Sequence, residues 1–240
     1  MRPKLWIFHL SIEVVKQLIE QLKEFISEER FNLFEQILQN RTNYITVAIE
    51  DIYQSHNASA VLRSCDCFGI QTVHVVEQQN EFIPNPEVAM GSSKWLNINH
   101  YKDKNALPNA ILTLKKQNYR VVATTPHQND TLLPDFDLEK GPVALLFGTE
   151  MRGLSNQAID LADEYLKIPM YGFTESFNIS VSVAIILNEL RQKLNKSSIP
   201  WQLNEQEYEE TLFKWIKASI KRPELIIERL QQNKKNNLTS

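Results

Sequence analysis

The sequence predicts an α/β fold: a mostly parallel sheet with helices on both faces, and helical extensions at both ends of the chain. Between residues 44 and 198, β-rich runs alternate with helical runs, which is typical of parallel sheets covered on both faces. The 240 residues are 42% hydrophobic and 23% charged, so the core needs no disulfide or metal to stabilise it. We therefore expect a domain at 44–198, a helical extension at 1–43, and a C-terminal helix with a tail at 199–240.

The N-terminal extension predicts two amphipathic helices, because apolar residues recur there at spacings of three and four. The first helix carries Ile12, Val15, Ile19, Leu22 and Ile26. The second helix carries Phe31, Phe34 and Leu38.

From residue 44 onward the pattern changes to that of a β-α-β unit. Residues 45–49 and 72–76 predict strands, and 58–68 predicts a helix that ends at Gly69. The alternation then continues. Further strands are expected at 95–98, 120–124, 143–147 and 165–168, and further helices at 107–117, 155–161 and 178–194. A final amphipathic helix is marked by Tyr208, Leu212, Trp215 and Ile216.

Composition excludes several classes of protein. No run approaches the roughly 18 apolar residues of a membrane span, and the first ten residues lack a small-residue cleavage site, so we expect a cytoplasmic protein that is not bound to a membrane. Cys65 and Cys67 would project about 200° apart on a helix, which disfavours a disulfide or shared metal ligation. We interpret both as small hydrophobic core residues. The histidines are scattered, and no protein-held metal is expected.

The net charge of −3 argues weakly against a nucleic-acid partner, but its distribution matters more. From Lys214 to Lys235 the chain has seven basic residues against two acidic ones. Such a tail can attract phosphate, although a charge cluster is more often a solvated surface.

One candidate functional segment contains two of the six glycines of the chain. Residues 145–155 run from an apolar strand into Gly148, Glu150 and Gly153, and ligands of parallel sheets bind at the carboxyl ends of strands. An ordinary strand-to-helix turn with Glu150 near the start of a helix would also explain the pattern. Neither G-x-G-x-x-G nor a Walker loop occurs, so a nucleotide-like cofactor would need another kind of loop.

Two further segments place polar groups beside apolar helices. In 168–180, Ser176 and Asn178 can each cap the long helix that follows. In 55–69, Asn57 stands at a helix start and Arg63 follows six residues later, on a helix expected to pack against the sheet. A permanent charge there needs a carboxylate or phosphate partner, and an ion pair with Asp66 or a more distant acid is the structural alternative.

Taken together and in this order, the three segments resemble the motifs of the SpoU family of SPOUT-class RNA methyltransferases, closest to its TrmH branch of tRNA (guanosine-2′-O)-methyltransferases. The pattern H-N-x-S-A-x-x-R-[ST]-x-D-x-x-G occurs at 56–69, F-G-x-E-x-x-G at 147–153, and I-P-M-x-G-x-x-x-S-[LF]-N-[VI]-S at 168–180. The similarity runs from about Phe31 to about Ile216. Three ordered matches are far more specific than any one of them.

The resemblance implies a homodimer and a sheet whose C-terminal part is threaded into a deep trefoil knot, although ordinary topology rules make knots very rare. Without it, the strand pattern would predict a doubly wound sheet. The resemblance also implies that the knot holds S-adenosylmethionine in the loops after 121–124, 147–149 and 168–177. The residues expected to bind this cofactor are Thr124, Thr125, Gly148, Ile168, Met170 and Phe177.

The resemblance further implies methylation of a ribose 2′-hydroxyl, with Arg63 as the catalytic arginine. Because the pKa of an arginine exceeds about 12, two versions stay open. Either Arg63 is deprotonated transiently with help from a substrate phosphate, or it stays charged and positions that phosphate. Asn57, Glu150, Ser176 and Asn178 match motif positions that orient the arginine, the ribose or the cofactor.

The expected substrate is a guanosine in the D-loop of tRNA. The nearest alternative is a ribosomal RNA methyltransferase of the same family. Many of those carry an added α/β RNA-binding domain, whereas residues 1–43 predict helices only. An alternative of another class is a non-catalytic RNA-binding dimer, and the joint presence of Arg63, Glu150, Ser176 and Asn178 speaks against it.

Overall fold

The computed structural model describes residues 11–126 and 131–229, and the chain divides into two compact units. One unit combines the two ends of the chain, 1–40 and 203–240, and the other spans Arg41–Gln202. Of the seven basic residues between Lys214 and Lys235, Lys234 and Lys235 lie outside the described residues.

The first unit is helical. It contains α1 (Ile12–Lys23), α2 (Glu28–Leu38) and α8 (Glu205–Ser219). Most of the apolar positions predicted from the spacing are buried, but Ile12, Ile26 and Tyr208 are only half-buried, and Ile26 follows the end of α1. Trp215 of α8 packs edge to face on Phe34 of α2, with ring centroids 5.6 Å apart. A capping box fixes the start of α8, because the Asn204 side chain accepts from the Glu207 backbone and the Glu207 carboxylate accepts from the Asn204 backbone. The helices from the two ends of the chain therefore share one core.

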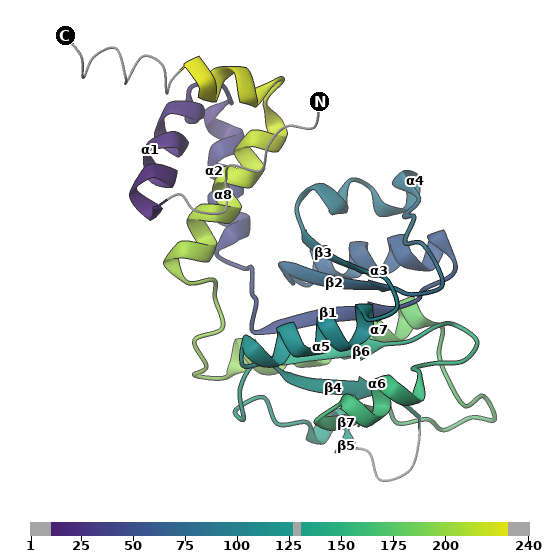
Figure 1. Ribbon diagram of the computed structural model, residues 1–240. Helices are drawn as coiled ribbons and strands as arrows, with labels where there is room; N and C mark the ends of the chain where they lie inside the picture. Colours follow the sequence, from purple (N-terminus) through teal and green to yellow (C-terminus); the bar gives the residue numbers. More distant parts are fainter. Residues whose placement is uncertain (1–10, 127–130, 230–240) are drawn as a thin grey trace. The chain divides into compact units, whose positions relative to one another are not determined.

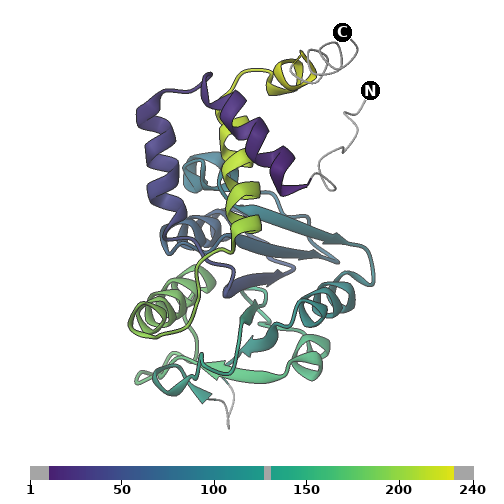
Figure 2. The same cartoon turned by 90° about the vertical axis from the view of Figure 1, so that its left-hand side faces the viewer.

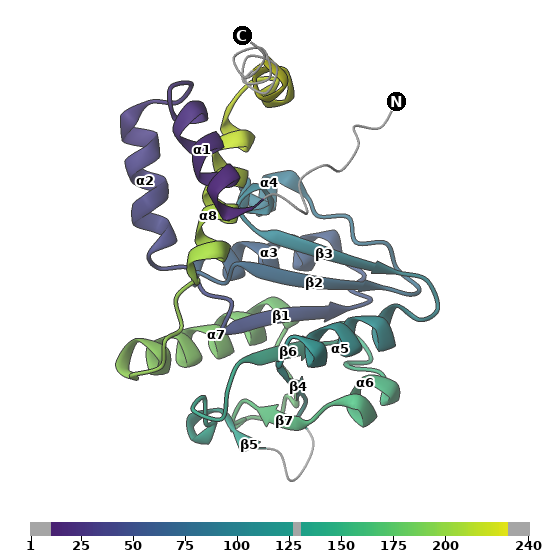
Figure 3. The same ribbon diagram turned by 60° about the vertical axis from the view of Figure 1, so that its left-hand side comes forward.

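The second unit is built on a parallel sheet of seven strands (Figures 1 and 3). Every pair of neighbouring strands that is hydrogen-bonded in this sheet is parallel. The strand order is β3-β2-β1-β6-β4-β7-β5. The strands are β1 (Ile45–Glu50), β2 (Thr72–Glu77), β3 (Asn97–Lys102), β4 (Arg120–Thr124), β5 (Thr131–Leu132), β6 (Val143–Phe147) and β7 (Glu164–Lys167). The predicted α/β class with a mostly parallel sheet is confirmed.

Helices cover both faces of this sheet, as Figure 2 shows. On one face, α3 (Ser55–Cys67) and α7 (Ile179–Lys196) pack on the inward side chains of β1, β2 and β6. On the other face lie α5 (Ala106–Lys116) and α6 (Asn156–Leu161). Three short helices complete the unit, namely α4 (Pro86–Ala89), η1 (Ser92–Lys94) and η2 (Leu133–Asp135). The central strands β1 and β6 are buried on both sides, which explains their continuous apolar sequence.

Two details differ from the sequence-based expectation. The strand expected at 95–98 is β3 at Asn97–Lys102, whose mostly polar, partly exposed residues match an edge strand and give only a weak apolar pattern. Of the two cysteines expected in the core, Cys65 is buried but Cys67 is exposed. The expectation for Cys67 was wrong because a residue two positions from a buried one projects to the opposite side of a helix.

Candidate active site

The three segments singled out in the sequence meet at one edge of the sheet. Strands β1, β4, β6 and β7 run parallel, so the loops that leave their carboxyl ends lie at the same edge. This is the edge at which open α/β sheets bind their ligands. The helices α3 and α7, which follow two of these loops, pack against each other on one face.

Asn57 and Glu150 connect the first segment to the second. The side-chain amide of Asn57 donates to Oε1 of Glu150 at 3.0 Å and to Oε1 of Gln54 at 3.1 Å. Asn57 is buried in the first turn of α3, where an unpaired amide would be costly. Its hydrogen bonds therefore fix the start of α3 to the loop after β6.

Glu150 accepts two more hydrogen bonds at the same place. The backbone N–H of Gln54 donates to it at 3.1 Å, and that of Tyr53 at 3.3 Å. Burial opposes ionisation of Glu150, but the hydrogen bonds from Asn57, Gln54 and Tyr53 outweigh it and hold the pKa of the carboxyl below its ordinary value. The carboxylate thus stays charged at the positive end of α3 and serves to hold that helix.

Asn178 extends the same chain of hydrogen bonds to the third segment. Its Oδ1 accepts from the backbone N–H of Ser180 at 2.9 Å, which caps α7. Its Nδ2 donates to Oδ1 of Asn57 at 3.1 Å. Of the two residues that could cap α7, Asn178 is the cap and Ser176 is not. One buried asparagine therefore joins the starts of α3 and α7 to Glu150.

Arg63 lies outside this network. It is exposed on α3, and it makes no hydrogen bond or ion pair with any described residue. The alternative of an ion pair with Asp66 is wrong, because Asp66 is the partner of the buried Arg41 guanidinium. Arg63 is left as a positive charge facing solvent from a helix whose position the network fixes.

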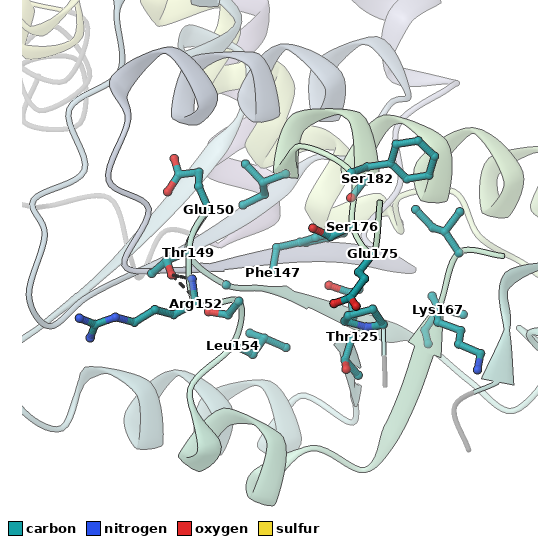
Figure 4. A pocket seen from close by; sticks show the side chains of 18 of the residues that line it. Thr125, Phe147, Thr149, Glu150, Arg152, Leu154, Lys167, Glu175, Ser176 and Ser182 are labelled. Carbon is teal, nitrogen blue, oxygen red and sulfur yellow. Dashed lines mark hydrogen bonds between the residues drawn. The ribbon is translucent and has the colours of Figure 1, made fainter. Parts of the chain in front are cut away.

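A cavity of about 410 Å³ opens at the carboxyl ends of β4, β6 and β7 (Figure 4). Its lining includes all six residues expected to bind the cofactor, together with Glu150 and Ser176, whereas Asn57, Arg63 and Asn178 do not line it. The walls mix apolar and polar groups, and the apolar part includes Leu154, Ile159, Leu166, Ile179 and Ile186. The volume falls in the range of about 300 to 1,000 Å³ that is usual for small-molecule sites.

A tight loop forms one wall of the cavity. Thr149 and Gly153 exchange two backbone hydrogen bonds, of 2.9 and 3.0 Å, and Gly153 adopts a left-handed conformation with φ +67°. A Cβ on Gly148 would overlap the backbone of Gly153 and Leu154. The two motif glycines are therefore explained by the folding of this loop, which also carries Glu150 at the border of the cavity.

Sequence reasoning missed several residues that line the cavity. Lys167 and Glu175 lie within the predicted loops or at their edge, but neither was assigned to the site. Ser182 and Ile186 project from the first turns of α7, four residues apart on one face of the helix. This helical spacing is a signal that could have found them.

No set of three or more His, Cys, Asp and Glu side chains in the described parts of the chain is arranged to hold a metal ion. Among the described helices, none is long and apolar enough to cross a membrane.

Comparison with known proteins decides the family. The model of the SpoU rRNA methylase family matches residues 44–188, more than half of the chain. The chain belongs to this family. Its SpoU segment contains β1 to β7, the cavity and the polar network, and it ends within α7.

Relatives of the SpoU chain show how far the similarity extends. The chain is 42% identical over 214 residues to the tRNA (guanosine(18)-2′-O)-methyltransferase of Borreliella burgdorferi. The aligned region covers 89% of this chain and 96% of the relative. Among solved structures, the A. aeolicus TrmH/SpoU tRNA modifying enzyme matches with a TM-score of 0.70 and 27% identity, over 81% of this chain and 98% of that one.

A second structure has the same fold at lower identity. The SpoU methyltransferase AviRb from Streptomyces viridochromogenes, in complex with the cofactor AdoMet, matches with a TM-score of 0.56 and 22% identity. The match covers 68% of this chain and 65% of that one.

Proposed function

We propose that this SpoU methyltransferase transfers a methyl group from S-adenosylmethionine to the ribose 2′-hydroxyl of a guanosine in the D-loop of tRNA. The observation that carries the proposal is the hydrogen-bonded chain Asn178–Asn57–Glu150. It fixes the helix of Arg63 beside a loop that also lines a cofactor-sized cavity. The tRNA assignment is supported by the relative from Borreliella burgdorferi, with which the similarity extends over nearly the whole length of both proteins.

The cavity fits S-adenosylmethionine in size and chemistry. The cofactor carries no phosphate, so it needs no glycine-rich phosphate loop, and the chain has none. Apolar walls suit the adenine ring, and the polar backbone at Thr125, Gly148 and Ile168 suits its edge and the ribose. When bound, the cofactor supplies a methyl group activated by a positively charged sulfur.

The residues of the chain then have to position the ribose and remove its proton. Arg63 is charged and exposed at one side of the site, and we propose that it binds a phosphate next to the target ribose. Glu150 is unsuited to act as the base, because its carboxylate is engaged by three donors. Asn57, Glu150 and Asn178 are positioning residues in this proposal, and Ser176 contacts the ribose or the cofactor from the cavity wall.

Orientation supplies most of the rate enhancement in this proposal. Methyl transfer requires the hydroxyl oxygen in line with the methyl group, and correct alignment alone can contribute several orders of magnitude. With S-adenosylmethionine bound, the hydroxyl oxygen would form the new bond to the methyl carbon while the sulfur kept the electron pair of its broken bond. The residues of the chain would orient the hydroxyl, whose proton would leave to a phosphate or solvent. Whether Arg63 also takes part in that proton transfer is the alternative version of its role.

We also propose that residues 44–198 form the methyltransferase domain and that its C-terminal part is knotted. Support comes from the crossovers in the sheet: β6 is inserted between β1 and β4, while β7 pairs with the other side of β4. The chain then returns to the opposite face, where α7 packs against α3. A cytoplasmic location, expected from the sequence, is part of the same proposal.

A homodimer completes the proposal. Apolar side chains on the loops around the cavity point into solvent, with Met151 and Tyr171 each 96% exposed and Phe173 fully exposed. Val181, in the first turn of α7, is also exposed. Exposed apolar groups gathered on neighbouring loops are typical of interaction surfaces, and a second copy of this chain would bury them.

The deciding experiment presents the full chain with labelled S-adenosylmethionine and, separately, with tRNA and ribosomal RNA that lack the modification. Mass spectrometry of the products then maps the methylated riboses. We expect 2′-O-methylguanosine in the D-loop of tRNA. Methylation confined to ribosomal RNA would overturn the substrate, and RNA binding without cofactor binding would favour the non-catalytic alternative.

A further inference from the structure

We propose that Glu175 makes the cavity select for the positive charge on the sulfur of S-adenosylmethionine, so that the neutral product S-adenosylhomocysteine is held less firmly. The inference rests on the proposed function, and it assigns to Glu175 a role in specificity and product release.

Four charged residues line the cavity, namely Glu150, Arg152, Lys167 and Glu175. The carboxylate of Glu150 is occupied by Asn57 and by the backbone at the start of α3. Figure 4 shows the side chain of Arg152 extending away from Glu175 and Thr125, on the far side of Thr149. Only Glu175 and Lys167 therefore have charges that can face a ligand there.

Glu175 is the charge that points toward the cavity. Its side chain is directed toward Thr125 in Figure 4, between the loop that follows β4 and its own loop. It forms no hydrogen bond or ion pair with any described residue, and the ammonium of Lys167 is directed elsewhere in the same view. The carboxylate of Glu175 is thus available to a ligand, unlike that of Glu150.

Glu175 is itself exposed to solvent, and its effect on a ligand depends on the side chains beside it. Phe177, Ile168 and Ile186 contribute apolar walls to the same cavity. Such walls exclude water when a ligand is bound, and opposite charges attract more strongly where water is excluded. A carboxylate in this setting favours a cation over an uncharged molecule of nearly the same shape.

S-adenosylmethionine and S-adenosylhomocysteine differ in the positive charge on the sulfur, to which the carboxylate of Glu175 is attracted. Methyl transfer removes one carbon and one positive charge from the sulfur, while the adenosine, the amino group and the carboxyl group stay the same. Glu175 therefore attracts the sulfur of the cofactor before methyl transfer, when it is positively charged, and does not attract it afterwards, when it is neutral. The consequence is weaker binding of the product, which helps the site to exchange it for a new cofactor.

The test compares Glu175→Gln with the unchanged protein by titration calorimetry, using three ligands. S-adenosylmethionine carries the sulfonium, sinefungin carries an amine near that position, and S-adenosylhomocysteine is neutral there. Glu139→Gln is the matched control, because Glu139 is an exposed carboxylate that does not line the cavity. Thermal unfolding of both variants checks that they fold.

We expect Glu175→Gln to weaken the binding of S-adenosylmethionine and sinefungin about five- to tenfold, and that of S-adenosylhomocysteine less than about twofold. In the unchanged protein, high salt should reduce the difference in affinity between the positively charged ligands and S-adenosylhomocysteine. Equal losses for all three ligands would overturn the proposal, because Glu175 would then contact the shared amino group. No loss for any ligand would overturn it as well. If the unchanged protein binds none of the three, the proposed function itself is wrong.

Discussion

The amide of Asn57 donates to the carboxylate of Glu150 across 93 positions of sequence, and this contact fixes the start of α3 to the loop after β6. Asn57 is buried, and Glu150 also accepts from two backbone groups of the same helix start. The contact is therefore part of a small network whose members should depend on one another.

A double-mutant cycle tests that dependence. We expect Asn57→Ala and Glu150→Ala each to lower the free energy of unfolding by about 1 to 3 kcal/mol, because each leaves the partner groups unpaired. The double variant should lose less than the sum by at least about 0.5 kcal/mol, measured by urea denaturation. Gln36→Ala, at an exposed site of α2, is the control. Strict additivity would show that the two side chains act separately.

Arg63→Ala should separate catalysis from folding and from cofactor binding. Because Arg63 is exposed and has no partner among the described residues, its removal should leave the melting temperature unchanged. Cofactor affinity should stay within about twofold, since Arg63 does not line the cavity. The rate of methyl transfer to tRNA should fall by at least about a hundredfold.

Two further variants sharpen the Arg63 experiment. Arg63→Lys keeps the positive charge. If this variant keeps partial activity and its main defect is a raised KM for tRNA, the result favours the version in which Arg63 positions a phosphate. Lys116→Ala, at an exposed position on α5, controls for the general loss of one positive charge. An Arg63→Ala variant with near-normal activity would remove Arg63 from the proposed mechanism.

Gly148→Ala should disrupt the loop that forms one wall of the cavity. A methyl group at Gly148 would overlap the backbone of Gly153 and Leu154, so the loop has to open. We expect cofactor affinity to fall by more than about tenfold in calorimetry. The control is Gly172→Ala, because a Cβ at Gly172 meets nothing within 4 Å. Equal effects of the two substitutions would mean that loop geometry does not control binding.

His74 should make the stability of the protein depend on pH. Burial lowers the pKa of His74 from 6.5 to about 4, so the unfolded chain takes up a proton at higher pH than the folded one. The contribution of His74 to the free energy of unfolding is complete above pH 6.5 and declines as the pH falls toward 4. Between these two pH values the protein should lose about 3 kcal/mol of stability from this group.

The difference between the unchanged protein and His74→Phe isolates this contribution. Phenylalanine can keep the stacking on Tyr101 and does not titrate. The free energy of unfolding of His74→Phe should therefore fall less between pH 7.5 and pH 5 than that of the unchanged protein. Glu50, whose pKa is raised by burial, acts in the opposite direction but is present in both proteins and cancels. His56→Gln, at an exposed site, is the control. Parallel stability curves would contradict the prediction.

The proposed dimer makes a separate prediction. Replacing both Tyr171 and Phe173 by Ser should weaken self-association by at least about tenfold, measured by sedimentation. The same replacement at Leu112, which is 53% exposed on α5, should have no effect. If the unchanged protein sediments as a monomer, the proposed homodimer is wrong. That result would not bear on the proposal that the cavity binds the cofactor.

The sequence predicted the sheet and the cavity more completely than the polar network. Buried parallel strands such as β1 and β6 have continuous apolar runs, and their carboxyl ends must lie together, so the loops around Gly148 and Ile168 could be assigned to one site. The strand β5 escaped prediction because its two residues at the sheet edge are too short to show a period.

The role of Glu150 could not be predicted in the same way. The sequence suggested that it lies near the start of the helix that follows it, whereas it binds the start of α3, about ninety residues earlier in the chain. Long-range pairing of this kind depends on which strands are neighbours, and the insertion of β6 beside β1 is not encoded in any local pattern. The availability of Glu175 likewise depends on the direction of a loop side chain.

The unit that joins α1 and α2 with α8 has a consequence for the order of synthesis. The ribosome makes α1 and α2 first, but their partner α8 follows only after the whole of Arg41–Gln202 has been made. Until then, the ring of Phe34 has no Trp215 to pack against. The nascent chain therefore carries an uncovered apolar surface while the sheet forms, which makes this end the natural place for a chaperone to act.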